Sequence, residues 1–333
     1  MDLSVGTPVD PVPALIRRAL ADASDAPGYP LTAGTPALRA AIAGWLSRSC
    51  RASGELGVLP TLGSKELVAW LPTLLGVGAG DVVVIPSVCY PTYEVGVMLA
   101  GATAVRSDSL TALGPDPRVK LVWVNSPSNP TGRVLPVEHL RKVVAWARER
   151  GAVVASDECY LSLGFQTRPV SVLDDAVTAG DYTGVLAVHS LSKRSNLAGY
   201  RAGFVGGDPA LLAGLLAVRK HAGMIVPAPV QAAMIAALGD ETHVDEQRER
   251  YAARRETLRA GLAKAGFELS HSEAGLYLWA TRGEDCWQTV DWLAERGILA
   301  APGVFYGPAA RQHVRVALTA TDERVAAAVA RLT

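Results

Sequence analysis

The sequence predicts an α/β fold: a large domain with a mostly parallel sheet flanked by helices, plus a smaller α/β domain. Short, largely apolar runs suited to buried strands occur at residues 82–85, 119–124, 152–155 and 185–188. A helical pattern at 137–150 separates the second run from the third, which gives the strand–helix–strand alternation of doubly wound sheets. The chain has 333 residues, enough for a large core and two lobes.

The composition is that of a soluble globular protein, with 49% hydrophobic residues and 32 basic residues balanced by 32 acidic ones. Zero net charge gives no electrostatic reason to expect nucleic acid or an anionic membrane as a partner. The four cysteines have no CxxC spacing, so we expect no metal site and a cytoplasmic, reducing location. No signal peptide is apparent at the start of the chain, and the most apolar window, 67–75, is too short to span a bilayer.

Two helices are expected in the first fifty residues. The first covers 14–21 and follows a segment rich in Pro and Gly. The second begins at Thr35 and Pro36, with Thr as the cap and Pro in the first helical position. Its apolar residues recur at helical spacing on one face, at Leu38, Ala41, Ile42 and Trp45. Tyr29 lies in the loop before this helix, and from its residue type alone it is interpreted as an aromatic that anchors the loop.

A further helix start is expected at Gly63 and Ser64. The free backbone amides and positive dipole end of such a start suit a phosphate, although many helices begin with Gly-Ser and bind nothing. Pro72 is expected to kink this helix or to end it. The strand at 82–85 then leads to two tyrosines, Tyr90 and Tyr93, either of which can be a binding residue or a structural aromatic.

Polar residues follow the next two strands. The strand at 119–124 leads into NSPSNPTG, a tight turn at the strand end where open α/β sheets bind ligands. The strand at 152–155 leads into SDECY, which contains Asp157. An acid at the end of a buried strand is costly without a partner, and the alternative is a helix cap in a loop.

The segment HSLSKRSNLAGYRAG, residues 189–203, carries the main chemical prediction. Lys193 lies among hydroxyls and arginines after a buried strand, where a lowered pKa would make its amine a nucleophile toward aldehydes. Ser190 and Arg201 can return to the same place and bind a phosphate. Together they indicate a lysine in Schiff-base linkage to pyridoxal 5′-phosphate (PLP). The alternative for an isolated SxSK sequence is a solvated lysine in a surface turn.

The last third of the chain is less informative. Residues 219–238 are expected to leave the large domain and cross to the small one. A long charged helix follows at 242–266, with its charges on a solvated face. The alternating run EAGLYLWA predicts a strand of the small domain. Arg315 lies in a further strand, where a lone arginine is usually a surface residue.

The segment around Lys193 resembles the lysine signature of class I/II aminotransferases of PLP fold type I, and the resemblance covers almost the whole chain. It implies that Lys193 is the catalytic Schiff-base lysine. It also implies that Asp157 pairs with the pyridine nitrogen and that Tyr90, rather than Tyr93, stacks on the ring. The remaining cofactor-binding residues that it implies are Gly63, Ser64, Lys65, Asn129, Tyr160, Ser190 and Arg201.

The same resemblance implies the substrate contacts and the assembly. Arg315 pairs with the substrate's α-carboxylate, beside Asn129, and Gly6 closes over it. Tyr29 reaches the cofactor phosphate of a neighbouring subunit, which implies a homodimer with shared active sites. We expect residues 29–228 to form the large PLP-binding domain, and 1–28 with 229–333 to form the small domain with the N-terminal segment.

Long phrases, among them GSKELVAWLPTLL and RKHAGMIVPAPVQAAM, are similar to actinobacterial succinyldiaminopimelate transaminases. The implied reaction converts N-succinyl-LL-2,6-diaminopimelate and 2-oxoglutarate to N-succinyl-2-amino-6-oxopimelate and glutamate by ping-pong chemistry, in lysine and diaminopimelate biosynthesis. The alternatives are an aminotransferase of aromatic or aspartate-like specificity, or a PLP lyase of the same fold. A PLP-binding transcription regulator is set aside, because the chain has no room for a DNA-binding module.

Overall fold

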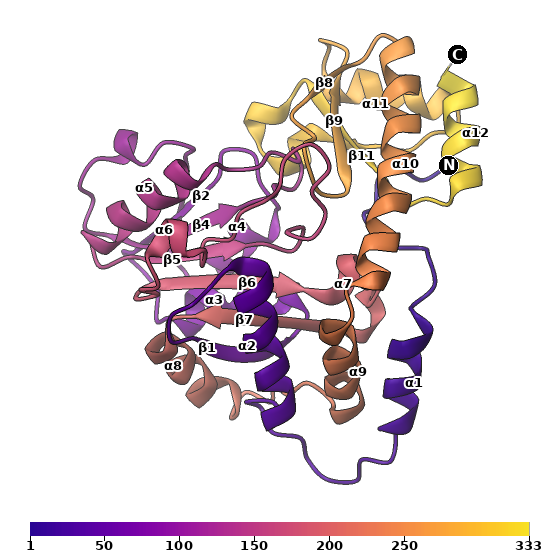
Figure 1. Cartoon of the computed structure of the whole chain (residues 1–333). Coiled ribbons are helices and arrows are strands. Elements are labelled where there is room, and N and C mark those ends of the chain that lie inside the picture. Colours follow the sequence, from indigo (N-terminus) through magenta and orange to yellow (C-terminus); the bar gives the residue numbers. More distant parts are fainter. Residues whose placement is uncertain (333) are drawn as a thin grey trace.

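The computed structural model describes residues 1–332 as a large α/β part with a smaller part packed above it (Figure 1). The large sheet has seven strands in the order β1-β7-β6-β5-β4-β2-β3. Strands β2 to β6 pair in parallel where they are neighbours, and β7 is antiparallel to both β1 and β6. In chain order the strands are β1 (Gly57–Leu62), β2 (Val82–Ile85), β3 (Thr103–Arg106), β4 (Val119–Asn125), β5 (Val153–Asp157), β6 (Val185–Ser190) and β7 (Ala202–Gly207). The predicted fold class is confirmed.

Helices cover both faces of the large sheet because alternate strand residues point to opposite sides. Val82 and Val84 belong to one core, while Val83 and Ile85 belong to the other. The first face packs against α2 (Pro36–Cys50), α5 (Val137–Arg148), α6 (Asp175–Thr178) and α9 (Ala228–Gly239). The second face packs against α3 (Ser64–Leu74), α4 (Thr92–Leu99) and α8 (Pro209–Arg219).

Local sequence sets several helix ends as expected. The Thr35 hydroxyl accepts a hydrogen bond from the Leu38 amide at 3.1 Å, and Pro36 opens α2. Gly63 is the cap residue of α3. Pro72 lies inside α3, which continues for two residues beyond it to Leu74, so the proline stands in the last turn.

The smaller part contains a four-stranded antiparallel sheet in the order β10-β11-β9-β8. Its strands are β8 (Glu268–Ser270), β9 (Tyr277–Thr281), β10 (Ala301–Pro302) and β11 (His313–Ala317). Three helices surround it, namely α10 (Thr242–Lys264), α11 (Cys286–Glu295) and α12 (Asp322–Leu332). Short helices elsewhere in the chain are η1 (Thr111–Leu113), α7 (Leu191–Arg194), η2 (Ala198–Tyr200), η3 (Gly303–Tyr306) and η4 (Pro308–Ala310).

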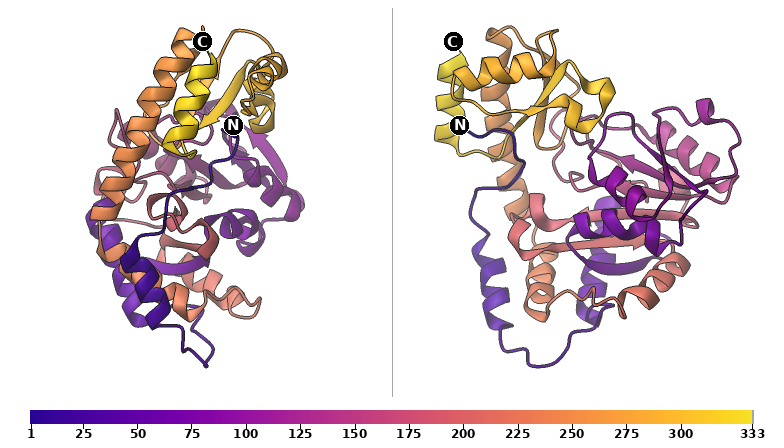
Figure 2. Two further views of the ribbon diagram at one scale, coloured as in Figure 1. Left: turned by 90° about the vertical axis from the view of Figure 1, so that its right-hand side faces the viewer. Right: turned by 180° about the vertical axis from the view of Figure 1, so that it is seen from behind.

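Packing moves the expected domain boundaries. Helix α1 (Ala14–Asp22) runs beside α9, as Figure 2 shows from behind, and both contribute to the core of the large sheet, through Ile16 and Met234 among others. Residues 14–22 and 228–239 therefore pack with the large domain rather than the small one. The chain crosses to the small domain through α10, and the expected crossing at 219–238 comes too early.

The charges of α10 were expected on a solvated face, and two of them are instead buried. The Arg254 guanidinium donates to both carboxylate oxygens of Asp10 at 2.7 Å, and its Nε donates to Asp322 at 2.6 Å. Arg255 donates to the Ser272 carbonyl at 2.9 Å. The reason is that Asp10 of the N-terminal segment, Asp322 of α12 and Ser272 after β8 all pack against α10. Across residues 1–332, no helix combines the length and the apolar character needed to cross a membrane.

Candidate active site

Strand ends bring the predicted residues into one cavity of about 550 Å³. Strands β4, β5 and β6 are parallel neighbours, so Asn125, Asp157 and Ser190 at their carboxyl ends reach the same edge of the sheet. The predicted residues that line the cavity are Gly6, Ser64, Lys65, Tyr90, Asn129, Asp157, Tyr160, Ser190, Lys193, Arg201 and Arg315. Gly63 lies against Arg201 at the same place. Tyr29 does not line the cavity, and its side chain is 99% exposed in this single chain.

Lys193 reaches the cavity from the short helix α7, which follows β6 directly. Its amine donates a hydrogen bond to the Gly6 carbonyl. Burial lowers the pKa of Lys193, and Arg315 and Arg201 lower it as well, while Tyr277 and Cys159 act in the opposite direction. A larger share of this amine is therefore neutral at a given pH than in a free lysine, and only the neutral form can attack a carbonyl or accept a proton.

Three groups next to Lys193 form a cradle for an anion. The start of α3 presents free backbone amides and the positive end of the helix dipole. Arg201, held in a left-handed conformation with a φ of 56°, donates from Nη1 to the Ala198 carbonyl at 2.8 Å. A Cβ atom on Gly63 would lie 2.3 Å from Nη2 of Arg201, so only glycine leaves room there for the guanidinium. With the Ser190 hydroxyl, these groups suit a phosphate.

Asp157 ends β5 as a buried acid without a basic partner. Its carboxylate accepts hydrogen bonds from the Tyr93 hydroxyl at 2.9 Å and the Cys159 amide at 3.2 Å. No ion pair joins it to a cation among residues 1–332. Burial raises the pKa of Asp157, while these two hydrogen bonds lower it. The arrangement leaves a carboxylate free to bind a protonated nitrogen on a ligand.

The tyrosines divide between the cavity and the core. Tyr90 is half-buried and lines the cavity. Tyr93 is fully buried and stacks on Trp123, with ring centroids 4.9 Å apart. The Tyr160 hydroxyl lies 3.2 Å from that of Tyr277, and burial raises the pKa of Tyr160. The position of Tyr90 in the cavity is consistent with its expected stacking role.

Arg315 is buried in the wall of the cavity and has no carboxylate partner among the described residues. Its Nη1 donates to the Asn129 side chain at 2.9 Å and its Nη2 donates to the Ser4 carbonyl at 2.6 Å. The guanidinium lies over the rings of Tyr277 and Tyr306, at 3.9 Å and 4.9 Å from their centroids. The buried Nε has no hydrogen-bond partner in the described chain. A buried cation with an unused donor favours a carboxylate ligand.

The N-terminal segment crosses the cavity and closes it. The carbonyl of Val5 accepts a hydrogen bond from Thr319, as that of Ser4 does from Arg315. A Cβ atom on Gly6 would lie 2.1 Å from the Tyr277 hydroxyl, so this close approach requires glycine. The N-terminal segment thus contacts the Lys193 amine through the Gly6 carbonyl and Arg315 through the Ser4 carbonyl.

The sequence analysis missed two residues of this site and one contact. Tyr277 and Tyr306 each present a ring to the Arg315 guanidinium, and Tyr93, expected to be a structural aromatic, donates to Asp157. The alternation in EAGLYLWA places Tyr277 and Trp279 on one face of β9, and this pattern is the sequence signal that could have identified Tyr277. Tyr306 comes from a short 3₁₀ turn, η3, and nothing in the local sequence marks it.

Comparison with known proteins gives consistent results along the whole chain. A family model described as "Aminotransferase class I and II" matches residues 1–332. The chain is 65% identical to a probable aminotransferase of Mycobacterium tuberculosis, over all of this chain and 80% of that protein. It is 61% identical to a 4-dedimethylamino-4-oxo-anhydrotetracycline transaminase of Streptomyces rimosus, over all of this chain and 93% of that protein.

Among solved structures, the fold is similar to that of a probable N-succinyldiaminopimelate aminotransferase from Thermus thermophilus. The TM-score is 0.91 and the sequence identity 29%, covering all of this chain and 94% of that one.

Proposed function

The chain belongs to the class I and II aminotransferases, which depend on PLP, and we propose that it exchanges the amino group between N-succinyl-LL-2,6-diaminopimelate and 2-oxoglutarate. The products are N-succinyl-2-amino-6-oxopimelate and glutamate. The likeness over the whole chain to the Thermus thermophilus aminotransferase supports this choice of substrate. The sequence phrases shared with succinyldiaminopimelate transaminases support it as well.

The cavity fits PLP in three respects. Lys193 is the more buried of the two lysines that line it, and its pKa is lowered. The unpaired Asp157 suits a protonated ring nitrogen, and the cradle of Gly63, Ser190 and Arg201 suits a phosphate. When bound, PLP supplies an electron sink that stabilises negative charge on the substrate's α-carbon.

We assign the steps to residues of this chain. Lys193 would hold the cofactor through Nζ, and the same amine, once released, would move a proton between the α-carbon and the cofactor. Asp157 keeps the proton on the ring nitrogen. Arg315, with Asn129, orients the α-carboxylate of the amino acid. The N-terminal segment around Gly6 excludes water from the bound substrate.

The amino-acid donor uses Arg315 whichever acceptor the enzyme serves, so this residue does not identify the acceptor. The identity of 61% to the Streptomyces rimosus transaminase favours a second candidate, amination of a polycyclic ketone with an amino acid as donor. The two candidates differ in the size and shape of the keto compound that corresponds to the amine, because N-succinyl-2-amino-6-oxopimelate is a flexible tricarboxylate and the other compound is a rigid fused-ring ketone.

Acceptor specificity is tested directly with the PLP-loaded protein. We expect glutamate to form from 2-oxoglutarate when N-succinyl-LL-2,6-diaminopimelate is the donor, and no glutamate from Lys193→Ala. Activity with 4-dedimethylamino-4-oxo-anhydrotetracycline and glutamate, in the absence of activity with the succinylated donor, would replace our proposal by the second candidate.

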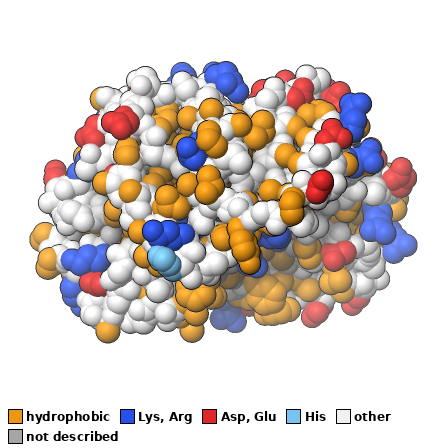
Figure 3. All heavy atoms as spheres, turned by 90° about the horizontal axis from the view of Figure 1, so that it is seen from below, with side chains coloured by type: hydrophobic (Ala, Val, Ile, Leu, Met, Phe, Trp, Pro, Cys, Tyr) orange, Lys and Arg blue, Asp and Glu red, His pale blue; other side chains and the backbone are white. Residues whose placement is uncertain are grey.

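We further propose that two chains form a homodimer in which Tyr29 of each reaches the neighbouring cavity. Tyr29 and Leu31 lie in the loop between α1 and α2, at the bottom of Figure 1, and are 99% and 59% exposed. Apolar side chains are spread over the middle of the face seen from below, with most charges toward its rim (Figure 3). An exposed apolar surface of this kind supports association with a second copy.

A further inference from the structure

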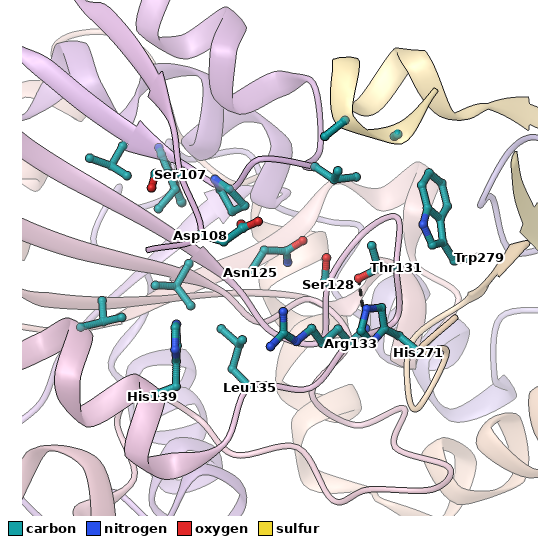
Figure 4. Close-up of a pocket in the computed structure, with 18 of the residues that line it drawn as sticks. Ser107, Asp108, Asn125, Ser128, Thr131, Arg133, Leu135, His139, His271 and Trp279 are labelled. Atoms are coloured by element: carbon teal, nitrogen blue, oxygen red, sulfur yellow. Dashed lines mark hydrogen bonds between the residues drawn. The ribbon is translucent and has the colours of Figure 1, made fainter. Parts of the chain in front are cut away.

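A second cavity, of about 510 Å³, lies between the large sheet and the small sheet (Figure 4). It shares no lining residue with the candidate active site. Its volume is within the range typical of small-molecule sites and close to that of the active-site cavity. Nothing in the proposed reaction uses it.

The cavity exists because one connection of the large sheet lacks a helix. Parallel strands are usually joined by a crossover helix, yet residues 107–118, between β3 and β4, form only the short turn η1. The β3–β4 and β4–β5 connections run in the same direction across the sheet, so the right-handed rule places both on the face covered by α5. A helix there would cover the α5-facing side of β2 and β4.

Behind the cavity lies the α5-facing side of β2 and β4. Val84, Val122 and Val124 line the cavity there but are only 1%, 2% and 5% exposed, so they back it and belong to the same core as α5. The half-buried Leu110 and Leu135 provide the apolar surface that a ligand can reach. Burial of an apolar group there stabilises a complex roughly in proportion to the area removed from water.

The rim of the cavity carries one free cation. The guanidinium of Arg133 forms no hydrogen bond or ion pair with any residue from 1 to 332, and Figure 4 shows it beside the hollow together with Ser128 and Leu135. His139, also in the lining, has its pKa lowered by burial and by the charge of Arg133, so it is mainly neutral at pH 7. Asp108 is the acid of the lining, and its carboxylate accepts from the Ser87 amide at 3.0 Å.

We propose that this cavity binds a small monocarboxylate with an aromatic or branched apolar body. The carboxylate pairs with the planar fork of Arg133, and the apolar body lies against Leu110 and Leu135. Trp279 forms the aromatic wall on the side of the small domain, where it stacks on His313 with ring centroids 5.0 Å apart. Asp108 disfavours a second negative charge on the ligand.

A ligand in this cavity touches both elements that present the carboxylate-binding groups of the active site. Ser128 and Thr131 line the cavity on either side of Asn129, whose side chain accepts from Arg315. Trp279 pairs with Arg315 in register across β9 and β11. Occupation of the cavity therefore changes the affinity for the substrate carboxylate, and by linkage the substrate changes the affinity for the ligand.

The test uses 2-naphthoate, an intrinsically fluorescent aromatic monocarboxylate, titrated into PLP-loaded Arg315→Gln. This background lacks the arginine that would bind the probe in the active site. We expect saturable binding to one site and, with Arg133→Gln added, an affinity about 10 to 100 times lower, as expected for loss of a charge-assisted hydrogen bond. Leu110→Trp, which fills the cavity from a half-buried position, should weaken binding similarly.

The matched control is Arg118→Gln. Arg118 is an exposed arginine on the β3–β4 connection that pairs only with its neighbour Asp116, so this substitution should not change the affinity. No saturable binding at millimolar naphthoate, or affinities that Arg133→Gln and Leu110→Trp leave unchanged, would overturn the site. In enzyme with Arg315 intact, naphthoate can also compete at the active site, so the coupling is measured as the difference between two proteins: the change that naphthoate causes in the KM for glutamate should be smaller with Arg133→Gln than without it. The same change in both proteins would overturn the coupling.

Discussion

At the scale of single residues, the active site is defined by charged groups whose partners are missing from the chain. Asp157 and Arg315 are buried, lie in one cavity and form no ion pair within residues 1–332, and Lys193 is half-buried beside them. Uncompensated buried charge is costly, so a ligand that supplies the opposite charges is expected. A cofactor with an aldehyde, a protonated ring nitrogen and a phosphate, together with an amino acid carboxylate, supplies them.

Substitution of Arg315 should weaken amino-acid binding without removing the cofactor. We expect Arg315→Gln to raise the KM for glutamate by about 10 to 100 times, because a charge-assisted contact is lost. The KM of Arg315→Lys should lie between those of the wild type and Arg315→Gln, since lysine keeps the charge but not the planar fork. Steady-state kinetics measure this, with cofactor absorbance as the control. An unchanged KM in Arg315→Gln would mean that the carboxylate binds elsewhere.

Tyr93 is a positioning residue for Asp157, since it touches the carboxylate and does not line the cavity. Its hydrogen bond lowers the pKa of Asp157, so Tyr93→Phe should raise that pKa. Asp157 then becomes protonated at a higher pH, and activity should be lost earlier as the pH falls. The pH profile of kcat/KM measures the shift.

The control for this shift is Tyr182→Phe, which removes a hydroxyl that accepts a hydrogen bond from the Gly54 amide, outside the site. Acid limbs at the same pH in wild type and Tyr93→Phe would contradict this role of Tyr93.

At the scale of elements, a buried pair of titratable side chains, Glu158 and His189, connects the ends of β5 and β6. The Glu158 Oε2 and His189 Nε2 atoms lie 3.6 Å apart, a distance typical of an ion pair. Burial raises the pKa of Glu158 to about 7 and lowers that of His189 to about 3. Between these values the pair consists of a protonated carboxyl and a neutral imidazole, and we therefore interpret it as a neutral pair.

This pair predicts a pH dependence of stability. The folded-state pKa of Glu158 is above its ordinary value of 4.5, so its contribution to stability is complete below pH 4.5 and is lost as the pH rises through 7. The loss is about 3 kcal/mol, because one pKa unit corresponds to about 1.4 kcal/mol. Glu158→Gln should remove this pH dependence of stability. Unfolding free energies of both proteins from pH 5 to 8 measure the difference, and parallel profiles would contradict the prediction.

The elements also show what the sequence can predict. Four strands of the large sheet, β2, β4, β5 and β6, were predictable because each is a short, largely apolar run, as at Val82–Ile85, whereas β1, β3 and β7 were not predicted. The burial of Arg254 was not, because its partners Asp10 and Asp322 lie 244 and 68 residues away in the chain. Similarly, residues 107–118 contain no pattern that predicts a cavity. That cavity results from the packing of the small sheet against a strip that no helix covers.

At the scale of the whole molecule, the N-terminal segment links the two domains. It begins beside β10, crosses the active site at Gly6 and joins the large domain through α1, and Figure 2 follows it between the two parts. The resemblance predicted Gly6 and Arg315 in one site although 309 residues separate them, and the structure places both in the cavity. The contribution of a second chain stays a prediction.

Tyr29 tests that prediction. In a single chain its side chain is 99% exposed, so Tyr29→Phe should not change the stability of the monomer. If its hydroxyl contacts the phosphate in the neighbouring subunit, Tyr29→Phe should weaken PLP binding by about 10 times, the effect of one hydrogen bond to a charged group. Equilibrium titration of the apoenzyme with PLP measures the affinity, and light scattering measures the mass. A monomer in solution, or an unchanged PLP affinity, would contradict the shared site.

The covalent role of Lys193 is tested most directly by the absorbance spectrum of the purified protein with PLP, before and after glutamate. We predict a band near roughly 420 nm that bleaches when glutamate is added, because the amino group passes to the cofactor. Lys193→Ala should lack the linkage and the bleaching, while Lys65→Ala, the other lysine of the cavity, should retain both. A normal band and normal bleaching in Lys193→Ala would contradict the assignment of Lys193 as the lysine that attaches PLP and moves the proton.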